Sequence, residues 1–198
     1  MNIFILFCCI GFSTIFNAEL VAQPVYGHSG KIYNNLQEAL KNPDDVERLK
    51  LRRNKFRQFP KEIFQFKNLV ELDLTGNRIT ELPDSIYRLE NLTYLNLERN
   101  HITALPNGMG KMQKLRYLNI GKNRIDSLNT ALSNVNTLEF IQAWGNGITD
   151  VPDDFYKLKN LKYLDLRATI ITDDQREEIV KVLPKTFIYF SPSCNCKN

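Results

Sequence analysis

Residues able to act as nucleophiles, bases or metal ligands are few in this sequence and widely scattered. Its two histidines, His28 and His101, stand far apart at unrelated places. Cys194 and Cys196 form a Cys-x-Cys pair near the end of the sequence, which could close a small strained disulfide, bond to another chain or bind a metal. Because no histidine lies nearby, we expect no zinc site, and we predict an oxidised or solvent-exposed pair without a catalytic role.

Other short motifs do not match catalytic signatures. The Gly-Met-Gly run at 108–110 lacks the third glycine and the strand-to-helix context of a phosphate-binding loop. The acidic pairs at 44–45, 153–154 and 173–174 stand in loops or at helix starts, where carboxylates interact favourably with exposed N–H groups. Catalysis needs such groups to converge in a pocket, and the spacing indicates no convergence. The sequence therefore predicts a noncatalytic protein that uses no cofactor and no metal.

The composition is that of an ordinary globular domain. Of the 198 residues, 43% are hydrophobic and 24% are charged, which argues against a disordered chain. The formal net charge of +4 is small and the basic residues are clustered locally, so a nucleic-acid partner is not expected.

The first 22 residues differ in kind from the rest. Residues 3–16 form an apolar run, shorter than the roughly 20 residues that a membrane-spanning helix needs. A small residue, Ala22, precedes Gln23, so we predict a signal peptide at 1–22 that is cleaved before Gln23, leaving no stable membrane span. An uncleaved anchor is the alternative, since no Lys or Arg precedes the apolar run. We expect a protein that is secreted or resides in the cell envelope.

One pattern, apolar-x-x-Leu-x-Leu-x-x-Asn-x-apolar, returns every 23 residues from Val46 onward. Six copies in register are not a chance event, so residues 46–168 must form a stack of similar units. Both leucines of Leu-x-Leu point to one side of a short strand, and stacking buries them in a continuous core. The copies span 46–68, 69–91, 92–114, 115–137, 138–160 and, in part, 161–171.

The pattern resembles the leucine-rich repeat family, in the 23-residue form with Leu-Pro after the strand. This resemblance implies a right-handed α/β solenoid with a parallel sheet on its concave face; it is specific for fold and weak for function. Animal extracellular members usually carry cysteine-rich caps at both ends, and the absence of one at the N-terminal cap favours a bacterial secreted protein. The dipeptide appears as Phe59-Pro60, Leu82-Pro83, Leu105-Pro106 and Val151-Pro152.

Recurring positions outside the strands predict an amide column and a helical side. After each Pro, apolar residues at spacing three suit short 3₁₀ or helical turns on the convex side. The partial repeat has Thr169 where the others have Asn, so the column should end with the stack. A buried amide at this place can satisfy backbone groups where the chain turns. The column comprises Asn54, Asn77, Asn100, Asn123 and Asn146.

The two ends of the stack expose core and need caps. Residues 23–45 form an N-terminal segment with a short amphipathic helix after Asn35, which closes the first end. Residues 172–198 form the second cap and the Cys-x-Cys tail. There, Thr172 with Gln175 three residues on predicts a capping box, and a helix followed by a final strand at 185–190.

The register assigns the residues of the concave face, and we predict that this face binds a protein or peptide. Trp, Tyr and Arg dominate binding hot spots, which favours Trp144 as an anchor projecting into solvent. Two structural interpretations stay open: the tyrosines stack across strands as consensus residues, and Trp144 tilts inward to cover the small Ala143. The candidate binding residues are Tyr94, Asn96, Tyr117, Asn119, Phe140, Gln142, Trp144, Tyr163 and Arg167.

A basic cluster in the first repeat carries the alternative function. Arg48, Lys50, Arg52 and Arg53 could dock an acidic glycan or another anionic cell-surface component, with the aromatic residues stacking on sugar faces. The simpler interpretation is a solvated terminal repeat that is partly neutralised by its neighbours.

Overall fold

The computed structural model describes residues 30–192, and the fold is carried by the unit Lys31–Ser191. The predicted signal peptide at 1–22 and the Cys194–Cys196 pair lie outside the described residues. Among the residues that are described, no helix has the length and apolar character needed to cross a membrane.

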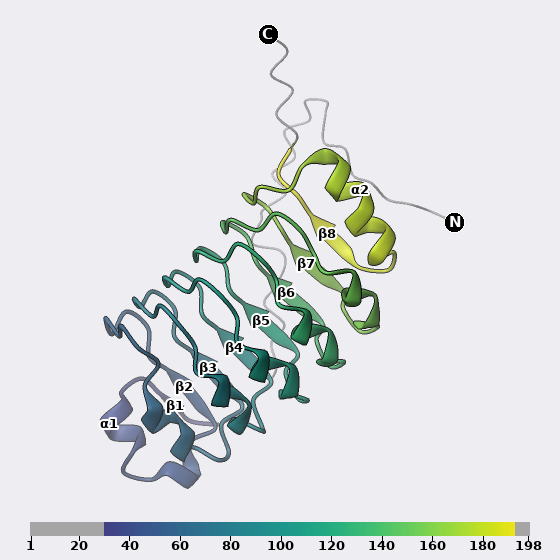
Figure 1. Cartoon of the computed structure of the whole chain (residues 1–198). Helices are drawn as coiled ribbons and strands as arrows, with labels where there is room; N and C mark the ends of the chain where they lie inside the picture. The colour runs from purple at the N-terminus through teal and green to yellow at the C-terminus, as the bar shows by residue number, and fades with distance from the viewer. Residues whose placement is uncertain (1–29, 193–198) are drawn as a thin grey trace, which may run out of the picture. The chain divides into compact units, whose positions relative to one another are not determined.

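Eight parallel strands form one sheet, and each strand lies beside its neighbour in the sequence (Figure 1). The pairing joins equivalent positions of successive repeats, such as Tyr94 with Tyr117 and Asn96 with Asn119. The predicted leucine-rich repeat solenoid with a parallel sheet is therefore confirmed. The strands are β1 (Ile32–Tyr33), β2 (Arg48–Lys50), β3 (Glu71–Asp73), β4 (Tyr94–Asn96), β5 (Tyr117–Asn119), β6 (Phe140–Gln142), β7 (Tyr163–Asp165) and β8 (Phe187–Tyr189).

Short 3₁₀ helices return the chain from one strand to the next, on the side of the stack opposite the sheet (Figure 1). Proline precedes most of them because its fixed φ suits the entry to a helix and it has no N–H to leave unpaired. Asn129 replaces that proline before η5, and its side chain accepts a hydrogen bond from the Ala131 N–H at 2.8 Å. The helices are η1 (Pro43–Asp45), η2 (Lys61–Gln65), η3 (Asp84–Arg88), η4 (Asn107–Lys111), η5 (Thr130–Asn134) and η6 (Asp153–Lys157).

The core runs along the stack between the sheet and the 3₁₀ helices. The central residue of each repeat strand is fully buried, and the apolar residue in the middle of each 3₁₀ helix from η2 to η6 belongs to the same core. Burying one such side chain contributes roughly 1.5–3 kcal/mol, so neighbouring repeats stabilise each other chiefly through these residues. The strand set is Leu49, Leu72, Leu95, Leu118, Ile141 and Leu164, and the helix set is Ile63, Ile86, Met109, Leu132 and Phe155.

The asparagine column ties each repeat to the one before it. Asn100, for example, donates to the Leu74 carbonyl of the preceding repeat at 3.0 Å and to the Leu97 carbonyl of its own at 2.9 Å. Its side-chain oxygen accepts the N–H of Ile79 at 3.0 Å. Asn77, Asn123 and Asn146 repeat this arrangement.

The first and last members of the column differ. The expectation that Asn54 is buried is wrong: it is exposed and donates only to Arg52 O, at 3.0 Å, within the described residues. Asn54 belongs to the first repeat, so no preceding repeat supplies the second carbonyl. Thr169, in the last repeat, donates to the Leu166 carbonyl at 2.6 Å.

Short elements lie at both ends of the stack. Helix α1 (Leu36–Ala39) follows Asn35, whose side chain accepts the Glu38 N–H at 3.0 Å. Strand β1, which the repeat pattern does not reveal, precedes it and pairs with β2. At the other end α2 (Asp173–Val182) begins with a capping box, and β8 then pairs with β7.

Candidate functional site

The outer face of the sheet, opposite the leucine core, carries a row of rings. We call Tyr94, Tyr117, Phe140, Tyr163 and Phe187 the aromatic ladder; strand pairing places each beside the next. Tyr94 and Tyr117 stack with ring centroids 4.4 Å apart and planes 3° from parallel. The following pairs are 6.5, 6.4 and 6.4 Å apart. Spacings of this size are favourable for aromatic pairs.

The three tyrosines among the candidate binding residues are buried rather than open to solvent. Tyr94, Tyr117 and Tyr163 are only 7%, 1% and 7% exposed, because close-spaced rings on adjacent strands cover one another. The Tyr117 hydroxyl also donates to the Gln142 side-chain oxygen at 2.5 Å. Burial raises the pKa of Tyr94 to about 12 and raises the pKa values of Tyr117 and Tyr163 as well. These tyrosines are therefore neutral hydrogen-bonding groups within the ladder.

The polar side chains beside the ladder also form hydrogen bonds within the protein. The Asn96 side-chain oxygen accepts the Glu98 N–H at 3.0 Å, and that of Asn119 accepts the Gly121 N–H at 2.9 Å. Both residues are buried, so the expectation that they present polar groups to a ligand is not met by their geometry. Gln142 departs from this pattern: it is half-buried and holds the Tyr117 hydroxyl.

Trp144 lies against the neighbouring strand. A Cβ built onto Gly121 would stand 2.5 Å from Trp144 Nε1, so the indole occupies the space that a side chain at 121 would need. Lys122 Nζ lies 4.7 Å from the centre of the Trp144 ring, within the range of a cation–π contact. The indole therefore rests over Gly121 and remains partly exposed.

The basic residues of the first repeat have internal counter-ions. Glu71 pairs with Arg48 at 2.6 Å and with Lys50 at 2.8 Å, and Arg52 pairs with Asp73 at 2.7 Å. Although burial opposes it, hydrogen bonds from Lys50 and Arg48 hold the pKa of Glu71 below its ordinary value. The positive edge predicted here is thus largely neutralised by β3, with Arg53, the fourth predicted anion ligand, exposed.

Arg167 is held in place by its own strand. Its guanidinium donates to both carboxylate oxygens of the buried Asp165, at 2.9 and 2.6 Å. Its Cζ lies 5.6 Å from the centre of the Tyr189 ring. A bidentate pair of this kind fixes the orientation of the arginine, whose side chain stays 40% exposed.

Two residues of β8 join the face although the sequence did not predict them. Phe187 continues the aromatic ladder and is 49% exposed, and Tyr189 lies 5.1 Å from Tyr163 between ring centroids. The available signal was the alternation in Phe-Ile-Tyr, which places Ile188 toward the core and its neighbours outward.

Together these observations identify the rings of the outer face that solvent can reach. We call Phe140, Trp144, Phe187 and Tyr189 the C-terminal aromatic patch; Gln142 and Arg167 adjoin it. Such a surface can offer apolar contact, a guanidinium and an amide to a ligand. Within residues 30–192 no group of three or more His, Cys, Asp or Glu side chains could hold a metal ion.

A family model described as leucine rich repeat matches residues 44–102 and 91–148. The chain belongs to the leucine-rich repeat family. Members of this family and the structural neighbours below are typically noncatalytic binding modules. No curated protein sequence matches the chain.

Solved structures support the same fold. A leucine-rich repeat protein of Leptospira interrogans is 29% identical, with a TM-score of 0.59 over 74% of this chain and 44% of that one. An internalin from Listeria monocytogenes is 25% identical, with a TM-score of 0.56 over 68% of this chain and 38% of that one. The ectodomain of an Arabidopsis thaliana membrane receptor kinase, solved in complex with CASPARIAN STRIP INTEGRITY FACTOR 2, is 26% identical, with a TM-score of 0.58 over 72% and 17%. The chain thus spans less than half the length of each.

Proposed function

We propose that this protein is a noncatalytic binding module that takes a protein or peptide segment on the outer face of its sheet, at the C-terminal aromatic patch. The observation that carries the proposal is the exposure of large rings on a structured sheet. Phe187 is 49% exposed, and Phe140, Trp144 and Tyr189 are only partly covered. Exposed apolar residues gathered on one surface commonly mark a binding site.

Two side chains of this face, Arg167 and Trp144, already have contacts within the protein before any partner arrives. Asp165 orients Arg167 through two hydrogen bonds, and the indole of Trp144 lies in the space over Gly121. A preformed site loses little side-chain entropy on binding, so more of the contact energy appears as affinity. Tryptophan, tyrosine and arginine are also the residues most enriched among binding hot spots.

The family context supports a protein ligand outside the cytoplasm. The leucine-rich repeat fold commonly mediates protein binding, and the plant receptor ectodomain was solved in complex with CASPARIAN STRIP INTEGRITY FACTOR 2. We place this protein in the secreted or cell-envelope compartment on the basis of the signal peptide predicted at 1–22. Sequencing the mature amino terminus tests this placement, because a chain that still begins at Met1 contradicts cleavage.

Site-specific photocrosslinking tests the binding face. A crosslinking residue at Phe187 is expected to capture a partner from the host's envelope fraction or culture medium. Tyr156 provides the matched control, because it is 53% exposed and lies on η6, on the helical side. Equal capture from both positions would contradict the proposed face.

Affinity measurements with the captured partner then identify the anchor. Trp144→Ala is expected to weaken binding by about 2 kcal/mol, whereas Tyr156→Ala leaves it unchanged. The thermal melting of both variants should stay close to that of the wild type. A Trp144→Ala variant with full affinity and a strongly lowered melting temperature would assign the indole a structural role instead.

An acidic glycan or anionic surface component remains the second candidate for this face. The pairing of Arg48, Lys50 and Arg52 with carboxylates of β3 makes it the weaker one. Ionic strength separates the two: charge-led binding weakens steeply between low and physiological salt, and binding led by aromatic contacts much less.

A further inference from the structure

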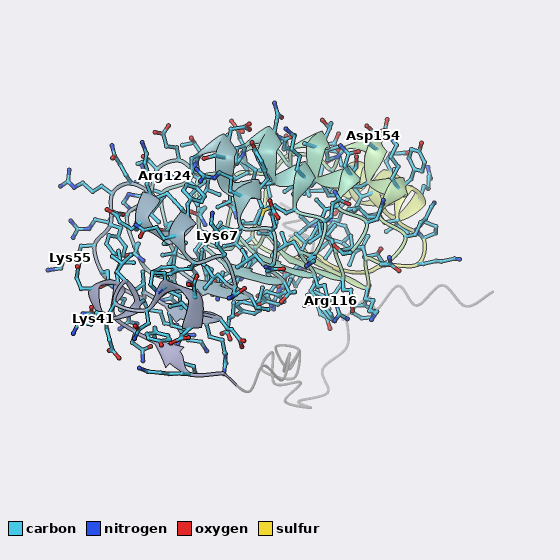
Figure 2. The ribbon with its side chains drawn as sticks, turned by 90° about the horizontal axis from the view of Figure 1, so that it is seen from below. Lys41, Lys55, Lys67, Arg116, Arg124 and Asp154 are labelled. Carbon is cyan, nitrogen blue, oxygen red and sulfur yellow. The ribbon has the colours of Figure 1, made fainter. Side chains whose placement is uncertain are left out.

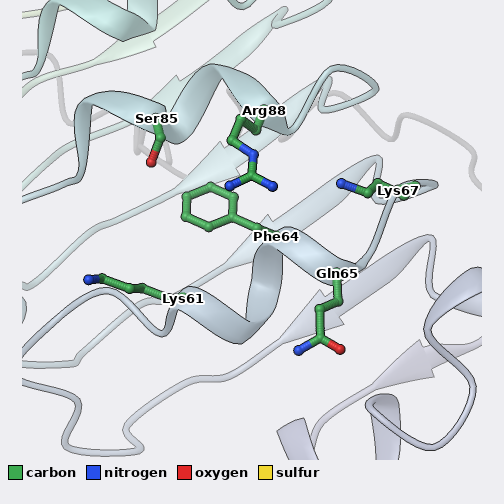
Figure 3. A pocket seen from close by; sticks show the side chains of 6 residues that line it. All are labelled: Lys61, Phe64, Gln65, Lys67, Ser85 and Arg88. Carbon is green, nitrogen blue, oxygen red and sulfur yellow. The ribbon is translucent and has the colours of Figure 1, made fainter.

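A pocket of about 460 Å³ lies on the helical side of the stack, on η2 and η3 (Figure 3). It belongs to the same early repeats whose outer sheet face is neutralised, but its lining has a different charge balance. Three of its six residues are cationic and two are neutral polar groups. The lining consists of Lys61, Phe64, Gln65, Lys67, Ser85 and Arg88.

The arginine of this pocket is positioned by a ring. Arg88 Cζ lies 5.2 Å from the centre of the Phe64 ring, which is itself 8% exposed. Phe64 in turn contacts Phe59, with centroids 5.4 Å apart. The ring supplies cation–π attraction, and its burial leaves it little freedom to move. The guanidinium is therefore partly ordered before a ligand arrives.

The cations of the pocket have no counter-ion in the described part of the chain. None of Lys61, Lys67 and Arg88 forms an ion pair there. The nearby Asp84 accepts the Gly108 N–H at 2.7 Å, which engages it with the next repeat. Glu62, beside Lys61 in sequence, is exposed on η2.

Two of the three cations, Lys67 and Arg88, lie toward the same side of the pocket, and the Lys61 ammonium points away from them (Figure 3). In Figure 3 the Lys67 ammonium points toward the side of the pocket where the Arg88 guanidinium stands over Phe64. Like charges that converge repel each other, and an anion between them would relieve that repulsion. Ser85 and Gln65 also line the pocket, and their side chains can donate and accept hydrogen bonds.

We propose that this pocket binds a phosphate or sulfate ester carried by a sugar-sized polar group. Arginine and lysine are the side chains suited to tetrahedral oxyanions, the former through its fork of N–H donors. The volume exceeds that of a bare oxyanion and lies within the range of small-molecule sites, which leaves room for the carrier. The polar lining favours hydroxyl groups on that carrier over a lipid chain.

Calorimetric titration of the full chain tests this site with glucose 6-phosphate, glucose 6-sulfate, glucose and inorganic phosphate as probes. We expect both esters to bind, inorganic phosphate to bind more weakly and glucose not at all. Lys67→Gln combined with Arg88→Gln should reduce ester affinity about tenfold or more. Arg88→Lys should cause a smaller loss, since it keeps the charge but not the planar fork.

A charge-matched variant, Arg124→Gln combined with Lys159→Gln, removes two exposed cations elsewhere and should leave ester binding unchanged. Equal losses in the two double variants would reduce the effect to net charge and overturn the site. Equal binding of glucose, or no ester binding at low salt, would also overturn it. Binding confined to vesicles of phosphatidylglycerol and phosphatidylcholine, with none to the sugar esters, would reject the sugar carrier in favour of a membrane surface.

Discussion

Strands β2 and β3 near one end of the sheet and β6 to β8 at the other share one backbone arrangement, but their outer faces carry different kinds of side chain. On β2 and β3, acidic and basic residues face each other across the strand pair, as in Arg48 with Glu71. On β6 to β8 the equivalent positions carry rings, and Phe187 at the far edge is half exposed. Figure 2 shows the basic residues Lys41 and Lys55 gathered at the N-terminal end of the stack and the acidic Asp154 toward the other.

The difference indicates where a ligand can gain from contact. Charges that are already paired and partly buried must be separated or matched again before they bind a partner, which reduces any net gain. Exposed rings gain from every apolar contact that removes water from them. The same sheet thus has charges that are already paired at one end and rings that are still exposed to water at the other.

The largest expected effect on stability comes from a buried ring of the aromatic ladder. Tyr117→Ala should lower the free energy of unfolding by about 3 kcal/mol, because it removes a side chain that is 1% exposed and stacked on Tyr94. Phe187→Ala, at the exposed end of the same ladder, should cost about 1 kcal/mol or less. Urea denaturation followed by circular dichroism measures both.

Phe187→Ala should have a larger effect on binding than on stability, in contrast to Tyr117→Ala. Phe187→Ala is expected to lower the affinity for the partner captured at the C-terminal aromatic patch while the fold stays intact. If Phe187→Ala destabilises the protein as much as Tyr117→Ala, the ladder is structural along its whole length. The contrast between the two ends would then be wrong.

The repeat pattern predicted strands β2 to β7, their order and the leucine core because each depends only on which residues recur. Leu72, Leu95 and Leu118 are buried wherever the copies stack. The pattern could not predict which rings of the outer face are covered. Tyr117 is buried because Tyr94 lies parallel to it and Gln142 accepts its hydroxyl, which are details of neighbouring side chains.

The residues missed by sequence reasoning fall where the period changes. Phe187 stands 24 positions after its pairing partner Tyr163, one more than the repeat length, because α2 replaces a 3₁₀ helix in the last turn. A list of face residues made by counting in steps of 23 therefore ends at β7.

The position of the Trp144 indole could not be predicted for a different reason. Gly121 and Trp144 occupy the same column in successive repeats, and only the side-chain geometry shows that the indole lies in the space over Gly121.

A smaller effect is expected from the charged end of the sheet. Glu71→Gln should destabilise the protein by about 2 kcal/mol at pH 7, because Arg48 and Lys50 lose a shared carboxylate in a partly buried place. The pKa of Glu71 is lower in the folded chain than in the unfolded one, where it is near 4.5. Its contribution is therefore complete above the unfolded pKa and is lost as the pH falls through the lowered folded pKa.

Denaturation curves measured from pH 7 to pH 3 check this dependence. The wild type should lose stability toward low pH more steeply than Glu71→Gln, so that the two curves converge below pH 4. Glu178→Gln is the matched control, since the Glu178–Lys181 pair is highly exposed and its loss should leave stability nearly unchanged. A gap between wild type and Glu71→Gln that is constant with pH would rule out the ion pairs as its cause.

The smallest energetic effect should come from the boundary between the two regions. Trp144 is the only tryptophan, so its fluorescence reports the position of the indole directly. Gly121→Ala adds a Cβ that would stand 2.5 Å from Trp144 Nε1, and the ring must shift to admit it. We expect a change in emission maximum and in quenching by iodide, with less than about 1 kcal/mol lost in stability because an exposed ring can move.

Gly147→Ala provides the comparison, because its added Cβ meets its nearest atom at an ordinary 3.6 Å and does not approach the indole. If the position of the Trp144 indole over Gly121 orders it for binding, Gly121→Ala should also lower the affinity for the captured partner. Gly147→Ala should leave that affinity unchanged. A spectral shift without any loss of affinity would show that the partner tolerates either position of the ring. The anchor role would then pass from Trp144 to the rings of β6 and β8.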